Sequence, residues 1–229
     1  MIMEQAHENK MTRDETLKVA LMVGKILLKS GAETYRVEDT INRFCIANGY
    51  EVDIFVTPTV IILGNEQVDS FNCVSRIRYR TTNLGMISEM NDMSYKFERW
   101  PMSYRGTMAW LEEKLKAQVP YGKWKVCLAS AIASASFSAM LGGNSHDFIA
   151  AFITGGIAML VLKQIAGYRP SAFWENALAG VAIGVVALIC CAVSVQCTME
   201  KIIVGALMPF VPGVAFTNGL RDYMAGDLL

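Results

Sequence analysis

Residues 119–126 read VPYGKWKV, and the composition of the chain differs on the two sides of this stretch. Residues 1–120 contain 15 Lys and Arg and 16 Asp and Glu residues, whereas residues 121–229 contain only six and five. The chain as a whole is 53% hydrophobic and has no net charge. This asymmetry predicts one part in water, followed by one in lipid. A neutral chain without a basic cluster is not expected to bind nucleic acid.

Before this stretch, the sequence predicts a small α+β domain over residues 1–120. A capping box of Thr12 and Glu15 begins an amphipathic helix, and a second box of Ser30 and Glu33 is expected to begin another that ends at Gly49. No apolar run precedes these helices, so no secretory signal peptide is predicted and this domain is expected in the cytoplasm.

The apolar period then changes from helical to alternating. Residues 52–56 alternate until Pro58 interrupts the pattern, so the stretch 50–63 is either one bent strand or two short ones. Residues 71–80 alternate again, and a three-stranded antiparallel sheet is the simplest arrangement. Two more helices are predicted at about 83–98 and 103–118. One stripe on the first of these favours core packing over a cofactor site: Met86, Met90, Met93 and Phe97.

The charged side chains of this domain have two interpretations. The pair Glu33 and Glu38 and the row Arg76, Arg78 and Arg80 are expected to be solvated faces; the alternative is contact with the membrane part or with a partner. The six cysteines show no C-x-x-C spacing and are expected to be reduced, and the chain has only two histidines. No metal site and no cofactor is therefore predicted.

After Lys125, residues 121–229 predict an α-helical polytopic membrane domain. Four apolar runs are each about long enough to cross a hydrocarbon core, at 126–142, 148–166, 172–195 and 202–217. Dense small residues predict close helix packing, either within the bundle or against a second subunit. Lys and Arg are concentrated in alternate connections, which predicts a multi-pass protein of the cell membrane with both ends in the cytoplasm.

The last predicted span contains helix breakers and is followed by charges. Pro209, Pro212 and Gly213 interrupt it, and the polar residues after the break are Asn218, Arg221, Asp222 and Asp227. One interpretation is a substrate path, with polar groups that bind substrate or carry coupling protons. The other is a bent packing helix with an interfacial anchor. The residues alone favour neither.

Three stretches of the chain resemble the threonine/serine exporter family: SGAETYRVEDT (30–40), DIFVTPT (53–59) and VPGVAFTNGLRDYMAGD (211–227). The resemblance covers nearly the whole chain. It implies a cytoplasmic amino-terminal domain, a membrane domain, and secondary export of small hydrophilic metabolites. These are threonine and serine, or a dicarboxylate such as succinate in a related two-subunit system. The resemblance also favours the substrate-path interpretation, and its motif residues in the first part are Glu33, Thr34, Arg36, Glu38, Asp39, Thr57, Pro58 and Thr59.

Two differences from the family pattern carry further expectations. Members usually continue beyond the G-D-L-L stretch into another membrane helix, so a truncation before that helix is expected. Fused members also contain a second, smaller membrane domain, so a small membrane partner subunit is expected here. Two alternatives are a non-transporting membrane sensor or scaffold and a membrane-attached enzyme. The weakness of the enzyme alternative is that the sequence shows no recognisable nucleophile–base pair.

Overall fold

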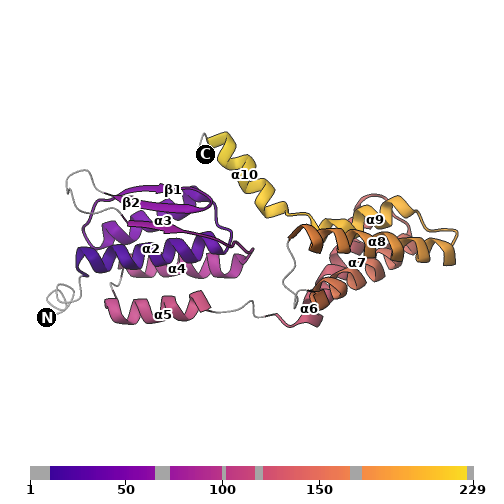
Figure 1. The fold of residues 1–229 in the computed structure, drawn as a ribbon, viewed down its shortest axis with the longest axis horizontal. Coiled ribbons are helices and arrows are strands. Elements are labelled where there is room, and N and C mark those ends of the chain that lie inside the picture. The colour runs from indigo at the N-terminus through magenta and orange to yellow at the C-terminus, as the bar shows by residue number, and fades with distance from the viewer. Residues whose placement is uncertain (1–10, 65–72, 100–101, 117–120, 166–171, 226–229) are drawn as a thin grey trace. The chain divides into compact units, whose positions relative to one another are not determined.

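The computed structural model describes residues 11–64, 73–99, 102–116, 121–165 and 172–225. The chain forms two compact units (Figure 1), one made of Met1–Val119 with Gly213–Leu229 and the other of Pro120–Pro212. The last helix therefore belongs to the same unit as the amino-terminal part, whereas the expected boundary near residue 120 groups it with the membrane part.

The first unit combines helices with one small sheet. Its elements in chain order are α2 (Arg13–Lys29), α3 (Thr34–Ala47), β1 (Asp53–Val56), β2 (Val60–Gly64), β3 (Cys73–Arg76), α4 (Leu84–Arg99), α5 (Tyr104–Lys116) and α10 (Gly213–Ala225). The strands pair antiparallel in the order β1-β2-β3, with Phe55 opposite Ile62 and Ile61 opposite Ser75. This confirms the predicted three-stranded antiparallel sheet.

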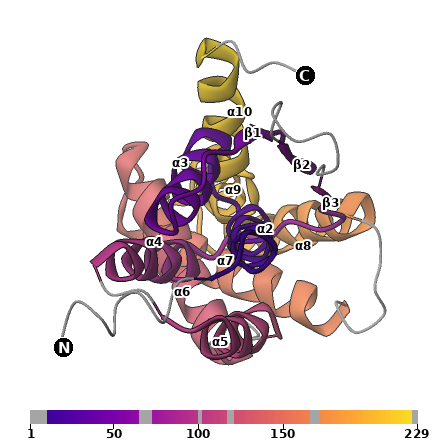
Figure 2. The same cartoon turned by 90° about the vertical axis from the view of Figure 1, so that its left-hand side faces the viewer.

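Helix α2 lies at the centre of this unit. It contacts β2 and β3 as well as α3, α4 and α5. Figure 2, which looks along α2, shows the strands on one side of it and α4 and α5 on the other. The predicted stripe on α4 lies in the core, because Met86, Met90, Met93 and Phe97 are all at most 9% exposed. The prediction that this stripe fills the core is confirmed.

The two predicted capping boxes have different outcomes. Thr12 and Glu15 form the first box at the start of α2. The second box is wrong, because Ser30 is the carboxyl-terminal cap of α2 and Glu33 caps α3 without a side-chain capping bond. The physical reason lies in the turn between the helices. Gly31 takes a left-handed φ of 86°, and a Cβ there would lie 2.9 Å from the Thr81 carbonyl oxygen.

The second unit is a bundle of helices packed through small residues. It contains α6 (Lys123–Met140), α7 (Ser145–Ile165), α8 (Ala172–Val193), α9 (Met199–Leu207) and the 3₁₀ turn η2 (Met208–Phe210). Its buried side chains are mostly small, whereas large apolar side chains of α7 and α8 are exposed, including Phe148, Ile149, Val185 and Leu188. Such a surface is unusual in water and typical of helices that face lipid.

Helix α6 approaches α7 and α9 closely at glycines. A Cβ on Gly155 of α7 would clash with Ser134 Oγ, and one on Gly205 of α9 would lie 2.8 Å from the Ser138 amide nitrogen. Ser130 donates a hydrogen bond to the Gly155 carbonyl across the α6–α7 contact, at 3.2 Å. Small residues therefore set the spacing of these helices, as the composition predicts.

Within the described ranges, two helices are long and apolar enough to cross a membrane, Ser145–Ile165 and Phe173–Val193. A third is counted if Met199–Phe210 and Gly213–Met224 form one broken span. Helix α6, which corresponds to the predicted run 126–142, is not among them. The predicted run 202–217 is not one continuous helix, because α9 ends at Leu207 and α10 begins only at Gly213.

One buried carboxylate connects two helices of this unit. Asp147, in the first turn of α7, is fully buried and accepts a hydrogen bond from the Thr198 amide at 2.5 Å. Its second oxygen accepts the Asn144 amide at 3.0 Å. Lys201 donates to the Gly142 carbonyl at 2.6 Å. The 142–147 connection is therefore joined to the start of α9.

Candidate functional site

The candidate site is the contact between the α2–α3 turn and helix α10. Because α2 ends at Lys29 and α3 begins at Thr34, the turn presents the Gly31 carbonyl and the side chains of Glu33 and Thr34 to α10. Asn218 and Arg221 lie three positions apart in α10, so they share one face of that helix. The turn and this face belong to the two family-like stretches 30–40 and 211–227.

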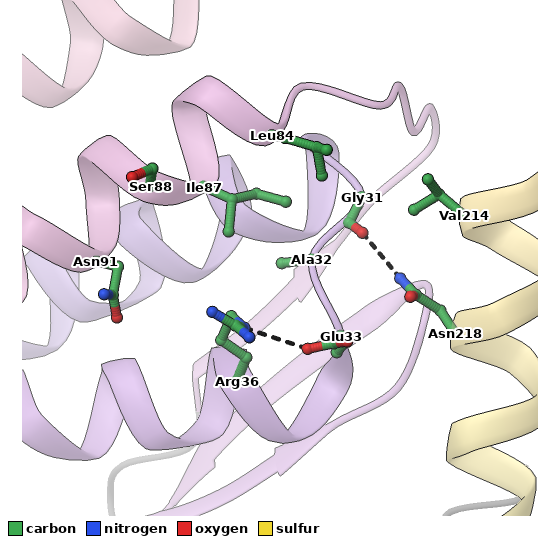
Figure 3. A pocket seen from close by; sticks show the side chains of 10 residues that line it. All are labelled: Gly31, Ala32, Glu33, Arg36, Leu84, Ile87, Ser88, Asn91, Val214 and Asn218. Atoms are coloured by element: carbon green, nitrogen blue, oxygen red, sulfur yellow. Dashed lines mark hydrogen bonds and ion pairs between the residues drawn. The ribbon is translucent and has the colours of Figure 1, made fainter.

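We define the α10 latch as three of the side-chain interactions between the turn and α10. Asn218 Nδ2 donates to the Gly31 carbonyl at 2.9 Å (Figure 3). Thr34 Oγ1 donates to Asp222 Oδ1 at 3.0 Å. Arg221 forms an ion pair with Glu33. Each of the three therefore joins residues more than 180 positions apart in the chain.

Glu33 is shared between two arginines of the latch region. Arg36 Nε donates to Glu33 Oε2 at 3.2 Å, while Arg221 contacts the other carboxylate oxygen. Burial acts to raise the pKa of Glu33. Hydrogen bonds from Tyr35 and Arg36 and the charges of Arg221 and Arg36 outweigh burial and lower this pKa below 4.5. Glu33 is therefore held as a carboxylate at neutral pH.

Arg80 supports the same turn from behind. Its guanidinium donates to the carbonyls of Leu28 at 3.2 Å and Ala32 at 2.9 Å, and a longer contact of 3.5 Å reaches the Pro58 carbonyl. Burial lowers the pKa of Arg80, and the nearby charge of Asp222 opposes that effect. Arg80 is exposed, as expected for a solvated face, but its guanidinium also bonds to this turn. It bonds to the turn because the chain after β3 passes beside the end of α2.

The second family-like stretch reaches the site indirectly. Thr57 Oγ1 accepts the Val60 amide at 3.0 Å, so Thr57, Pro58 and Thr59 form the tight turn between β1 and β2. Glu38 of α3 accepts the Val56 amide at 2.9 Å and joins that stretch to the first one. These residues hold the sheet against α3.

The remaining predicted residues lie outside the latch. Asp39 pairs with Arg43 along α3. Pro209 lies in the 3₁₀ turn η2, Pro212 lies in the break after it, and Gly213 is the first residue of α10. Among the described residues, no atom beyond the local backbone lies within 4 Å of a Cβ built on Gly213, so close packing does not require this glycine. Asp227 lies outside the described residues.

Sequence reasoning missed several parts of the site. It did not identify Gly31 and Tyr35 as members, although both lie within the quoted stretch 30–40. The guanidinium of Arg221 lies 5.9 Å from the centre of the Tyr35 ring, within the range of a cation–π contact. Among the described residues, no group of three His, Cys, Asp or Glu side chains is arranged to hold a metal ion.

Comparison with known proteins identifies the class. A family model described as "Putative threonine/serine exporter" matches residues 18–229, and the chain belongs to this family of transporters. The match includes both halves of the α10 latch. Membership indicates a membrane protein that handles small molecules, in agreement with the apolar helices α7 and α8. No curated protein and no solved structure matched the chain.

Proposed function

We propose that this chain is a membrane subunit of a secondary exporter of small hydrophilic metabolites, with threonine and serine as its substrates. A dicarboxylate such as succinate is the second substrate class. In this proposal α6, α7, α8 and α9 with η2 cross the cell membrane, and the amino-terminal α+β unit, which includes the end of α10, lies in the cytoplasm. A small membrane partner subunit completes the transport path.

The observation that carries this proposal is the α10 latch. Two stretches that resemble the exporter family, far apart in the chain, meet through Glu33–Arg221 and Thr34–Asp222. Helix α10 follows directly after the proline-containing break that ends α9. Breaks of this kind occur in transporters where a helix lines a substrate path. A polar contact at the end of such a helix is suited to control its movement.

The expected strength of the latch also fits a moving part. A neutral hydrogen bond contributes about 1 kcal/mol, and an exposed ion pair contributes about 0–1 kcal/mol. Arg221 is 55% exposed in its side chain, so its pair with Glu33 belongs to the weaker class. The three interactions together amount to a few kcal/mol. A ligand that favours the open latch about a hundredfold gains roughly 3 kcal/mol, which is enough to release it.

Arg221 has a direct role in this proposal. Its planar guanidinium can bind a carboxylate through two parallel hydrogen bonds, and every proposed substrate has a carboxylate. Because Glu33 occupies Arg221 in the closed latch, a substrate carboxylate competes with Glu33 for the same group. Asn218 and Asp222 on the same face supply further polar contacts, and Asp222 or Asp227 is the proposed carrier of coupling protons.

The test is export of labelled threonine, serine and succinate from cells with and without this chain, each with the neighbouring small membrane protein present or absent. Export of threonine or serine that requires the chain is the expected result. A cell that exports all three compounds equally well without the chain contradicts the proposal and favours a non-transporting sensor. Full activity of the purified chain alone in liposomes contradicts the need for a partner.

A further inference from the structure

A cavity of about 290 Å³ lies beside the α10 latch, within the first unit. Figure 3 shows that its lining comes from the α2–α3 turn and from helices α3, α4 and α10. This volume is close to the lower end of the range for small-molecule sites, about 300 Å³, and suits a ligand of few atoms. The sequence alone predicts no cavity at this place.

The lining combines one charge of each sign with neutral polar groups. Glu33 and Arg36 supply the charges, and Ser88, Asn91 and Asn218 supply hydroxyl and amide groups. Arg36 donates to Glu33 through Nε, and this bond uses only one of the five N–H groups of its guanidinium. Leu84, Ile87 and Val214 complete the wall with apolar surface. Such a lining matches a small molecule with both charges and a short side chain.

We propose that this cavity binds a small α-amino acid, with Arg36 and Asn91 holding its carboxylate and Glu33 holding its ammonium group. The choice of an amino acid rests on the proposed function, whereas the carboxylate site follows from the lining. A zwitterion has the same balance of charge as Glu33 with Arg36. A dicarboxylate adds two negative charges and leaves Glu33 facing a like charge, so it is expected to bind more weakly.

Occupation of this cavity affects the latch because two residues belong to both. Glu33 lines the cavity and pairs with Arg221, and Asn218 lines the cavity and donates to the Gly31 carbonyl. An ammonium group at Glu33 competes with Arg221 for the same carboxylate. The amino acid in the cavity therefore weakens the hold on α10, so that the cytoplasmic unit senses the substrate before export.

The test is binding of radiolabelled L-threonine to the purified full chain in detergent, with unlabelled serine and succinate as competitors. Ser88→Tyr fills the cavity from the exposed side of α4 without removing a latch residue. Lys96→Tyr, two turns further along the same helix and exposed, is the control. We expect threonine to bind the parent and Lys96→Tyr equally, and Ser88→Tyr to bind at least about tenfold more weakly.

Asn91→Leu is a second variant that removes a polar group from the cavity. It replaces Ser88→Tyr if Ser88→Tyr has a lower melting temperature than the parent. Equal binding of threonine by the parent and by a folded cavity variant overturns the proposal, as does an absence of binding by the parent at millimolar threonine. Stronger competition by succinate than by serine overturns the choice of an amino acid. Export by the parent is measured separately from binding. Loss of the cavity proposal shows in the binding assay, and loss of the exporter proposal shows in the export assay.

Discussion

Thr34 donates a hydrogen bond to Asp222, and 188 positions of the chain separate these two residues. Thr34 is almost fully buried at the start of α3. Its hydroxyl therefore needs a partner inside the protein, and α10 supplies one. The amino-terminal unit is incomplete without a helix from the far end of the chain. This dependence leads to the predictions below.

Replacement of Arg221 tests the latch and the proposed substrate contact together. Arg221→Lys keeps the positive charge but loses the planar fork, so we expect threonine export to fall about tenfold at equal membrane levels. Uptake assays in inverted vesicles measure this rate and the apparent affinity. If Arg221→Lys exports at the parent rate with unchanged affinity, Arg221 is an interfacial anchor only.

Glu33 gives the latch a defined dependence on pH. Because its pKa in the folded protein is lowered below 4.5, the carboxylate contributes stability that is present above pH 4.5 and is lost as the pH falls through the folded value. Glu33→Gln removes this contribution. Thermal unfolding in detergent should show a gap between parent and variant at pH 7 that narrows below pH 4.5. A gap of constant size down to pH 3.5 contradicts this assignment.

Arg80 and Arg78 form a matched pair for testing the support of the turn. Arg80→Gln removes donors from the carbonyls of Leu28 and Ala32, so we expect a loss of about 1–3 kcal/mol in the free energy of unfolding. Arg78 is exposed, and Arg78→Gln should change the stability by less than about 0.5 kcal/mol. Similar losses in both variants show that Arg80 acts through net charge alone.

The glycine contact between α6 and α7 is testable in the same way. Gly155→Ala places a methyl group against Ser134, so a loss of about 1–3 kcal/mol is expected from overpacking. Gly184→Ala on α8 places its methyl group more than 4 Å from every described neighbour beyond the local backbone, so it should be neutral or slightly stabilising. Melting temperatures in detergent compare the two variants. The prediction fails if Gly155→Ala is as stable as Gly184→Ala.

The proposed topology predicts which positions an impermeant thiol reagent can reach in intact cells. A cysteine at the exposed Ser145, at the start of α7, should be labelled from outside. A cysteine at the exposed Glu113, in α5, should be labelled only after the cells are opened. The parent, with its six cysteines, gives the background. Labelling at Glu113 in intact cells reverses the assignment.

Local patterns in the sequence predicted local structure well. The alternation at 52–56 and 71–80 predicted the sheet, because strands have a period of two. The stripe of Met86, Met90 and Met93 predicted a buried helix face, because these positions recur at helical spacing. The resemblance to a family drew attention to the stretches 30–40 and 211–227. No local pattern showed that these two stretches touch each other.

Features that depend on tertiary contact could not be predicted in this way. Arg76, Arg78 and Arg80 follow the same alternation, so nothing in the sequence distinguishes the one that bonds to the turn. The box of Ser30 and Glu33 has the right spacing, but Ser30 closes α2 and Glu33 pairs with arginines. Ser30 acts through its backbone N–H and Glu33 through its carboxylate, and a sequence pattern reveals neither use.

The buried Asp147 has a mechanical consequence. It belongs to α7, and it anchors the first turn of α9 through the Thr198 amide. A carboxylate that is fully buried against amide groups is costly to strip of its partners. Helices α7 and α9 are therefore joined at this end. A rearrangement of the bundle that separates the start of α9 from α7 has to break this contact and find new partners for the carboxylate.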